Sequence, residues 1–285
     1  MKLVSFQASD GPAVGLLHAD GVIDLSSAAP HLPRSMKQLL VKHGANLTAT
    51  VQKTYNVAPL PLEKIDFLPV VPDPNKIICI GRNYAAHARE GGAKPLEYPD
   101  IFMRVATSLT AHNKSILRPK SSEALDYEAE LVFIIGVETR HASEENALDA
   151  IAGYSIFNEG SIRDYQRKAT QWTPGKNFDK TVAFGPALVT TDVLPEGMCN
   201  ARIQTRLNGV TMQDSNTKNL IFPIGRLVSI LSEIMTLEPG DVVVSGTPEG
   251  VGHARRPPVW MKSGDYVEVE IEGLGVLSNT VEDET

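Results

Sequence analysis

The sequence of 285 residues predicts a strand-rich α+β protein with a small N-terminal α+β domain at residues 1–70 and a larger domain at residues 71–285. Three observations support this prediction. Short apolar runs bounded by Gly, Pro, Asn and Asp recur through most of the chain, which is typical of strands. The expected helices do not alternate regularly with these strands, which excludes a Rossmann sheet and a TIM barrel. Five prolines between residues 59 and 74 mark the boundary between the two domains.

The N-terminal domain is predicted to contain two short strands and one helix. The strands are the apolar runs at residues 3–6 and 13–17, which are separated by a turn signal. The helix covers about residues 36–43, where apolar side chains recur at helical spacing. Ser35 is a suitable N-cap for it, and Gly44 is a plausible C-terminal stop.

The larger domain is predicted to be mainly β with a few helices. Its expected strands are short apolar or alternating runs at residues 76–80, 131–137, 203–207, 242–244 and 266–271. The run 131–137 is apolar throughout, so we expect that strand to be buried on both faces. Asn208-Gly209 after the third strand is a strong hairpin signal. Helices are expected at residues 144–151, with Ser143 as the N-cap, and at residues 227–235.

Composition limits the class of protein. The chain has 27 basic and 34 acidic residues, a net charge of −7, and no conspicuous cluster of Lys or Arg. Nucleic acid and anionic membranes are therefore not expected partners. The longest apolar run is too short to span a bilayer, and the N-terminus lacks the apolar core of a signal peptide. Two cysteines far apart suggest neither a disulfide scaffold nor a zinc ribbon. A cytoplasmic enzyme or binding protein is the expectation.

Two Glu-x-Glu motifs in strands have different predicted environments. In each motif the period of two places both carboxylates on the same face of the strand. Around Glu268 and Glu270 apolar and polar residues alternate cleanly, so these acids are expected on a solvated face. Glu128 and Glu130 instead lead into the apolar run 131–137, so we expect them to be buried. Two buried carboxylates are costly unless a cation or a proton compensates, and a divalent metal is the natural choice.

A third carboxylate strengthens the hypothesis of a metal site. Glu159 follows a predicted strand end and precedes a short helix that contains Arg163 and Gln166. If Glu159 begins that helix, the three side chains lie one above the other on the same face. The alternative is an ordinary surface pair between Glu159 and Arg163, which contributes little to stability.

Three further segments carry chemically useful groups, each with a simpler explanation. His87 and Glu90 are spaced i,i+3 on a short helix, so the carboxylate can orient the imidazole, although such pairs are often structural. Lys176 lies in a Pro-Gly loop, where lysines are usually solvated. The turn 245–248, Ser-Gly-Thr-Pro, can bind an anion through backbone N–H groups, or it is an ordinary tight turn.

Together these segments resemble the fumarylacetoacetate hydrolase family from Lys76 to Val281. The motifs that carry the resemblance occur in the family's order and spacing: GRNYAAHARE (81–90), SLTAHN (108–113), DYEAEL (126–131), GYSIFNEGSIRDYQ (153–166), QWTPGKNFDK (171–180), RLNG (206–209) and SGTPEGVG (245–252). The resemblance implies a mixed β-roll core and a homodimer. Neither follows from the sequence pattern itself.

The resemblance also implies roles for individual residues. Those that would bind Mg²⁺ or Mn²⁺ are Glu128, Glu130 and Glu159. Those that would act in catalysis are His87 and Glu90, as a dyad that activates water, together with Lys176. Those that would contact the substrate are Arg82, Arg163, Gln166 and Thr247. The family's usual third ligand is Asp, so Glu159 is a departure that retains the carboxylate with one more methylene.

The activity that the resemblance implies is hydrolysis of a C–C bond in an acylpyruvate or related β-diketo acid, such as fumarylpyruvate, to pyruvate and a carboxylic acid. A divalent metal would act as a Lewis acid, and His87 would activate the attacking water. Arg104 and Arg255 are potential partners for a second substrate carboxylate, or surface arginines. The alternative activity is decarboxylation of oxaloacetate, or keto–enol tautomerisation or isomerisation of a 2-oxo acid, at the same metal site. A third alternative is a metal-stabilised binding module without catalysis.

Overall fold

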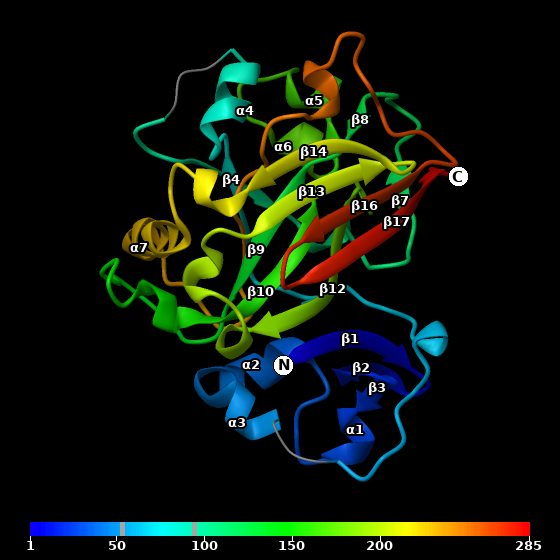
Figure 1. Ribbon diagram of the computed structural model, residues 1–285, viewed down its shortest axis with the longest axis vertical. Coiled ribbons are helices and arrows are strands. Elements are labelled where there is room, and N and C mark those ends of the chain that lie inside the picture. The colour runs from blue at the N-terminus through cyan, green and yellow to red at the C-terminus, as the bar shows by residue number, and fades with distance from the viewer. Residues whose placement is uncertain (52–54, 93–95) are drawn as a thin grey trace.

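The computed structural model describes residues 1–51, 55–92 and 96–285. It is a strand-rich α+β fold, as the sequence predicts (Figure 1). The strands are β1 Lys2–Ala8, β2 Gly11–His18, β3 Gly21–Asp24, β4 Ile77–Gly81, β5 Asp100–Arg104, β6 Leu109–Thr110, β7 Ile116–Arg118, β8 Leu125–Asp126, β9 Ala129–Ile135, β10 Ile151–Asn158, β11 Ser161–Ile162, β12 Val182–Thr190, β13 Arg202–Leu207, β14 Val210–Asn216, β15 Val242–Val244, β16 Tyr266–Ile271 and β17 Gly275–Asp283.

Seven α-helices lie within the described residues, and most of them are short. They are α1 Leu25–Ala28, α2 Met36–His43, α3 Leu47–Val51, α4 Ala85–Glu90, α5 Arg163–Gln166, α6 Thr173–Lys176 and α7 Ile224–Ile234. The helices α4, α5 and α6 gather at one end of the molecule, at the top of Figure 1. That end contains the carboxylates singled out from the sequence.

The largest sheet has the strand order β3-β2-β1-β12-β10-β9-β15-β4-β5, with β6 paired to β12. Its strand β9 is buried along its whole length, as the sequence predicts. Alternate side chains of β9 enter two different cores. Leu131 and Phe133 pack with Val269 of the second sheet, whereas Val132 packs in the core that contains Leu40 of α2. The absence of a polar face in this strand follows from this two-sided packing.

A second, five-stranded sheet has the order β14-β13-β16-β17-β7 and packs against the large sheet (Figure 1). Its strand β16 alternates between buried and partly exposed residues, so only one face contributes to the core. The strands β13 and β14 form the hairpin that Asn208-Gly209 predicts, and Asn208 has a positive φ of 51°. The interface between the sheets is the main hydrophobic core.

The N-terminal unit extends the large sheet. Strand β1 pairs antiparallel with β12, so the strands β1 to β3 continue the sheet of the larger domain at its lower end in Figure 1. The helix predicted at residues 36–43 is α2, and the Ser35 side chain accepts a hydrogen bond from the Gln38 N–H as its N-cap. The division into domains at residues 70 and 71 stays a proposal.

One predicted helix is wrong. Residues 144–151 do not form an α-helix; a turn at residues 144–146 leads into a short 3₁₀ helix, Ala147–Ala150, before β10 begins. Ser143 acts through its backbone carbonyl, which accepts a hydrogen bond from the Asn146 N–H. The 3₁₀ helix leads directly into β10 at Ile151. The side chains of Ala147 and Ala150 are buried and pack this short helix against the core.

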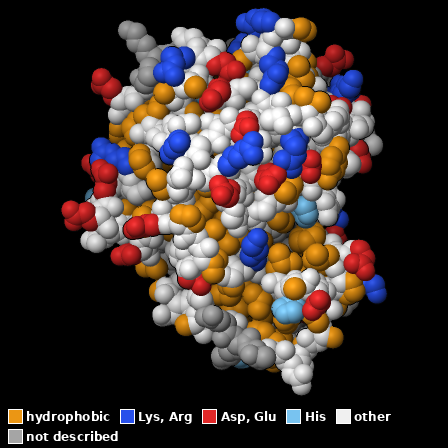
Figure 2. Space-filling view, in the orientation of Figure 1, with side chains coloured by type: hydrophobic (Ala, Val, Ile, Leu, Met, Phe, Trp, Pro, Cys, Tyr) orange, Lys and Arg blue, Asp and Glu red, His pale blue; other side chains and the backbone are white. Residues whose placement is uncertain are grey.

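The surface seen in Figure 2 carries Lys, Arg, Asp and Glu side chains interspersed over its upper part. Several of these charges are paired across strands, such as Arg202 with Asp214 and Arg206 with Glu268. This mixing is consistent with the net charge of −7 and the lack of a basic cluster in the sequence. Among the described residues, no helix combines the length and apolar character needed to cross a bilayer.

Candidate active site

A cavity of about 220 Å³ lies among α4, α5, α6 and the ends of the central strands. The residues that line it are Ile80, Gly81, Arg82, His87, Gly91, Phe102, Glu128, Glu130, Glu159, Arg163, Gln166, Arg167, Trp172, Lys176, Thr247 and His253. Nine of the ten expected site residues line this cavity, and Glu90 is the exception. The roles assigned to them stay predictions.

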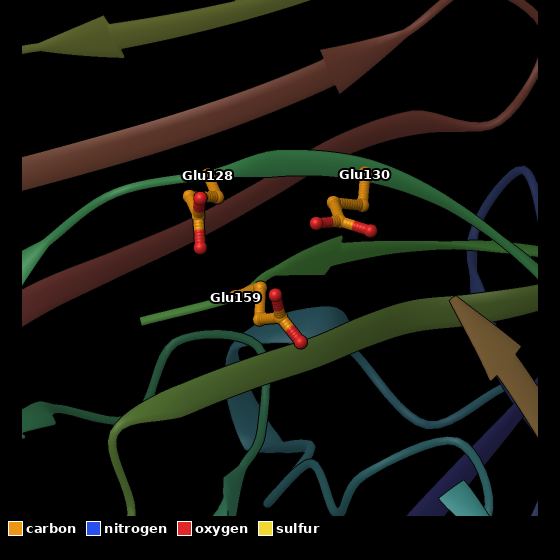
Figure 3. Close-up of side chains that lie close together, drawn as sticks. All are labelled: Glu128, Glu130 and Glu159. Carbon is orange, nitrogen blue, oxygen red and sulfur yellow. The ribbon is translucent and has the colours of Figure 1, made fainter. Parts of the chain in front are cut away.

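The three glutamates come from two neighbouring strands. Glu128 and Glu130 lie at the start of β9, and Glu159 follows the end of β10, its antiparallel neighbour. The Glu159 N–H donates to the Glu128 carbonyl over 2.8 Å, which continues the pairing of the two strands. One carboxylate oxygen of each glutamate lies within 4.8 Å of the other two, and all three side chains are buried. Figure 3 shows Glu128 and Glu130 directed toward Glu159.

Buried cations bind these carboxylates, and Lys176 and Arg163 both bind Glu128. Lys176 Nζ donates to Glu128 Oε2 over 2.7 Å and to Glu159 Oε2 over 2.6 Å. Arg163 Nη2 donates to Glu128 Oε1 over 2.7 Å, and its Nε donates to Asp126. The simpler explanation of Lys176 as a solvated loop lysine is wrong, because Lys176 ends helix α6 and only 3% of it is exposed.

The predicted alignment of Glu159 above Arg163 on one helix is wrong, and so is the alternative of a surface pair. Helix α5 begins at Arg163, after the short strand β11, so Glu159 lies outside the helix. Both residues are buried, and Arg163 binds Glu128 instead. The chain between Glu159 and Arg163 forms the short strand β11, which pairs with β8, so helical spacing does not apply to these two residues.

Arg104 is a third buried cation at the site. Its Nε donates to Glu159 Oε1 over 3.0 Å, its Nη2 donates to the Gly160 carbonyl over 2.8 Å, and its Nη1 donates to the Lys176 carbonyl. It therefore neither faces a substrate carboxylate nor lies on the surface, contrary to both expectations. The fixed guanidinium anchors the longer side chain of Glu159 in the cluster.

Arg255 is also held within the protein. Its Nη2 donates to the Met212 carbonyl over 2.6 Å, and its Nε donates to Tyr127 Oη over 3.1 Å. Arg255 does not line the cavity. Its role is structural, because it fixes the loop that follows β15.

Burial opposes the charge of every carboxylate in the cluster, and the neighbours decide the net shift. Burial by itself would raise the pKa of Glu128, but Arg163 and Lys176 outweigh it and hold this pKa well below its usual value. Lys176 lowers the pKa of Glu159 against burial in the same way. The pKa of Glu130 is raised well above its usual value by burial and by the charges of Glu159 and Glu128.

Glu130 is the carboxylate with the greatest need of a further cation. The Gly246 N–H donates to its Oε2 over 2.6 Å, but Glu130 has no ion pair among the described residues. A hard divalent cation prefers such oxygen ligands. The three glutamates therefore fit a Mg²⁺ or Mn²⁺ site.

Both members of the predicted dyad lie in α4, and a loop residue, Gly250, holds the carboxylate of Glu90. His87 Nδ1 lies 3.3 Å from Glu90 Oε2 within α4, so the carboxylate can orient the ring. The Gly250 N–H donates to both oxygens of Glu90 over 3.1 and 3.2 Å. His87 faces the cavity, whereas Glu90 stands behind it.

The loop after β15 supplies two more cavity residues. Thr247 Oγ1 accepts a hydrogen bond from Gln213 Nε2 over 2.9 Å, which fixes the hydroxyl predicted to bind a substrate carboxylate. His253, which the sequence analysis overlooked, also lines the cavity, and its Nδ1 lies 3.3 Å from Asp126 Oδ2. Asp126 lies in the DYEAEL motif, but nothing local in the sequence links it to residue 253.

The mouth of the cavity carries two arginines in different states. Arg82 Nε donates to Asp100 Oδ2 over 2.6 Å, and its guanidinium lies 5.9 Å from the centre of the Trp172 ring. Arg167, at the end of α5, is exposed and has no ion pair within the part of the chain that the structure describes. Arg167 is therefore the cation at this mouth that is available to an anionic ligand, and the sequence analysis overlooked it.

Comparison with known proteins identifies the family to which this chain is similar. The family model described as "Fumarylacetoacetate (FAA) hydrolase C-terminal" matches residues 76–282. The mitochondrial oxaloacetate tautomerase of Xenopus laevis is 41% identical over 99% of this chain and 90% of its own length. The corresponding human protein, also named as a mitochondrial oxaloacetate tautomerase, is 38% identical over 99% of this chain and 91% of its own length.

Solved structures share the fold over the whole chain. The structure of a fumarylacetoacetate hydrolase from Exiguobacterium antarcticum has a TM-score of 0.86 and 32% identity, and it covers 100% of both chains. That of a 5-carboxymethyl-2-hydroxymuconate delta-isomerase from Mycobacterium smegmatis has a TM-score of 0.78, 32% identity and the same coverage. With the match over residues 76–282, the chain belongs to the fumarylacetoacetate hydrolase family of enzymes.

Proposed function

We propose that this protein is an oxaloacetate tautomerase that depends on Mg²⁺ or Mn²⁺. The observation that carries the proposal is the 41% identity, over 99% of the chain, to a relative named as an oxaloacetate tautomerase. The buried glutamate cluster facing the cavity supports it, because its carboxylates would hold the divalent cation that assists keto–enol chemistry. Keto–enol tautomerisation of a 2-oxo acid is the alternative to C–C hydrolysis that the resemblance leaves open, and the similar proteins favour it over hydrolysis.

Glu128, Glu130 and Glu159 would hold the metal. When bound, it would supply a Lewis acid for the 2-oxo and carboxylate oxygens of the substrate. Thr247 would donate its hydroxyl to a substrate carboxylate while Gln213 fixes its position. Arg167 at the mouth would attract the second carboxylate of oxaloacetate, since it is not engaged with a described acid.

His87 would move a proton of the substrate. Glu90 orients the ring through Nδ1, which leaves Nε2 as the nitrogen that takes up or gives back the proton. Lys176 and Arg163 would stabilise negative charge on the enolate oxygens, because both cations are fixed in position and buried. Gln166, whose Oε1 accepts a hydrogen bond from Arg163 over 3.0 Å, would hold that guanidinium toward the cavity.

Hydrolysis of an acylpyruvate is the second candidate. The observation that favours it is the oriented imidazole of His87 in the cavity, which suits activation of a water molecule. The fumarylacetoacetate hydrolase from Exiguobacterium antarcticum, at 32% identity, adds support. In this reaction hydroxide would attack the distal carbonyl, and pyruvate would leave as its enolate.

One assay distinguishes the two candidates. Enol-oxaloacetate, acetylpyruvate and fumarylpyruvate would be compared at equal concentration with Mn²⁺ and then with excess EDTA. We expect metal-dependent acceleration of enol loss from oxaloacetate without release of CO₂. Pyruvate released from a diketo acid, without faster ketonisation of oxaloacetate, would overturn the tautomerase proposal in favour of the hydrolase.

The assembly and cellular location are also proposals. The family resemblance implies a homodimer, and light scattering of the purified protein tests it. A cytoplasmic location is one candidate, and a mitochondrial location is the other, since the similar proteins are named as mitochondrial. Fractionation of the source cells distinguishes the two locations.

A further inference from the structure

We propose that His253, oriented by Asp126, is a second proton-transfer residue of the cavity and serves carbon C3 of the substrate, next to the 2-oxo group. The inference rests on the proposed function and deepens it. No role for His253 follows from the metal cluster or from the pair of His87 and Glu90.

The position of His253 suits proton transfer. It lies in the short 3₁₀ helix Gly252–Ala254, and it lines the same cavity as His87. Its side chain is 13% exposed, so it is mostly enclosed while remaining open to the cavity. His253 Nδ1 lies 3.3 Å from Asp126 Oδ2. Since the two ring nitrogens lie on opposite sides of an imidazole, Nε2 remains as the nitrogen for a ligand.

Asp126 is held firmly enough to orient that ring. Its side chain is fully buried and accepts four other hydrogen bonds. Arg163 Nε donates to it over 2.8 Å, and the backbone N–H groups of Gly252, His253 and Tyr127 donate over 2.7, 3.1 and 2.9 Å. The carboxylate therefore fixes both the ring and the backbone of residue 253. A histidine used only to fill space would not need such an anchored acid.

The chemistry of tautomerisation needs two proton-transfer groups. In going from enol to ketone, the oxygen on C2 loses a proton, the C2=C3 double bond becomes C2=O, and C3 gains a proton. One base therefore takes up a proton while one acid gives up another, and exchange with solvent restores both. His87 and His253 are imidazoles from two different elements of one cavity, so each can serve one of the two atoms.

The hydrolytic alternative has the same requirement at C3. Cleavage of an acylpyruvate releases pyruvate as an enolate, and its C3 must gain a proton to give the ketone. His87 would already be engaged with the attacking water. A second imidazole is then the suitable donor, so His253 would serve C3 in either reaction.

The test is exchange of the methyl protons of pyruvate for deuterium in D₂O, followed by NMR with the Mn²⁺-loaded protein. Pyruvate carries the same C2 and C3 atoms and needs no cleavage or decarboxylation. His253→Asn keeps a donor near the position of Nδ1 and removes Nε2, and His253→Gln is the second variant. The control is His31→Gln, an exposed histidine outside the cavity.

We expect both His253 variants to slow the exchange by about 100-fold or more, as loss of a general acid–base group does. Their affinity for oxalate, an unreactive enolate analogue, measured by calorimetry, should stay within about threefold of the wild type, which is under 1 kcal/mol. Added imidazole should restore part of the exchange in His253→Asn, and His31→Gln should behave as the wild type.

Three results would overturn the inference: exchange that is unchanged in both variants, affinity for oxalate that falls as much as exchange does, or a wild-type protein that exchanges no C3 proton. The proposed function fails separately, by the oxaloacetate assay described above. A protein that exchanges pyruvate through His253 but hydrolyses acylpyruvates would keep this inference and lose the tautomerase proposal.

Discussion

The two Glu-x-Glu motifs of this protein occupy strands with opposite environments. Glu268 and Glu270 lie on the outer face of β16, with side chains 25% and 44% exposed, and both bind Arg206. This confirms the solvated face expected from their alternation. Glu128 and Glu130 lie at the start of β9 with almost no exposure. The same local motif thus forms a surface ion pair in one strand and the centre of a cavity in the other.

The two pairs of glutamates also differ in the cations that bind them. On β16 one arginine serves two glutamates, and water screens the rest of their charge. At β9 buried Lys176 and Arg163 bind Glu128, yet Glu130 keeps no cation among the described residues. Burying these charged groups removes them from water, which is unfavourable, and one carboxylate still has no cation partner. Such a site is suited to binding a metal ion.

The largest effect is expected from Glu130→Gln, with Glu270→Gln as the matched control. Loss of a residue that only hydrogen-bonds a metal ligand lowers metal affinity by about 10- to 100-fold. Loss of a ligand itself should therefore weaken Mn²⁺ binding by at least about 100-fold. Titration calorimetry measures this, and activity should fall with it. The metal-free variant should also melt at a higher temperature than the wild type, since a buried carboxylate repelled by its neighbours is removed. Equal Mn²⁺ affinity in the two variants would contradict the metal site.

Lys176→Met and Arg206→Met compare the two kinds of cation. Removing Lys176 leaves Glu128 and Glu159 without their shared donor, so the metal-free protein should lose about 3–5 kcal/mol of unfolding free energy. Removing Arg206 breaks surface pairs and should cost less than about 1 kcal/mol. Urea denaturation measures both, and saturating Mn²⁺ should restore part of the loss for Lys176→Met alone. Similar costs for the two would refute the contrast.

Arg167→Gln tests whether the arginine at the cavity mouth binds a substrate carboxylate. Arg206 is engaged with glutamates, whereas Arg167 is available to the second carboxylate of a substrate. The variant should raise KM for oxaloacetate by about tenfold, which is about 1.4 kcal/mol, with little change in kcat. Acetylpyruvate, which has one carboxylate, should be affected less. An equal rise in KM for both compounds would remove Arg167 from substrate recognition.

The smallest effect is expected at His112, where burial alone, without a neighbouring charge, shifts the pKa. Burial lowers the pKa of His112 to about 4 from its ordinary 6.5, because the neutral ring is favoured. Between these values the unfolded chain binds a proton that the folded protein does not, so stability falls as the pH drops from about 6.5 to about 4. His112→Gln should reduce this loss by at most about 1 kcal/mol, since the ring is partly exposed. Denaturation at pH 7 and pH 5 measures it, and an identical slope in both proteins would contradict the shift.

Much of the local structure was predictable, because side-chain periodicity and turn chemistry act over a few residues. The buried strand β9, the hairpin at Asn208-Gly209, the helix α2 and the i,i+3 pair of His87 and Glu90 all follow from neighbouring residues. Strands β12 and β17 were not identified, and only the end of β10 was, since each depends on its neighbours in the sheet for its pairing.

Residue patterns alone are enough to predict that the protein is strand-rich, that Glu128 and Glu130 share a face leading into a buried strand, and that His87 can be oriented by Glu90. Tertiary structure decided the rest of the site. Arg104 reaches Glu159 across 55 residues of sequence, and His253 reaches Asp126 across 127. Such partners are chosen by the packing of strands and loops. Local spacing determines which way a side chain points, but only the folded sheet determines which charge it meets there.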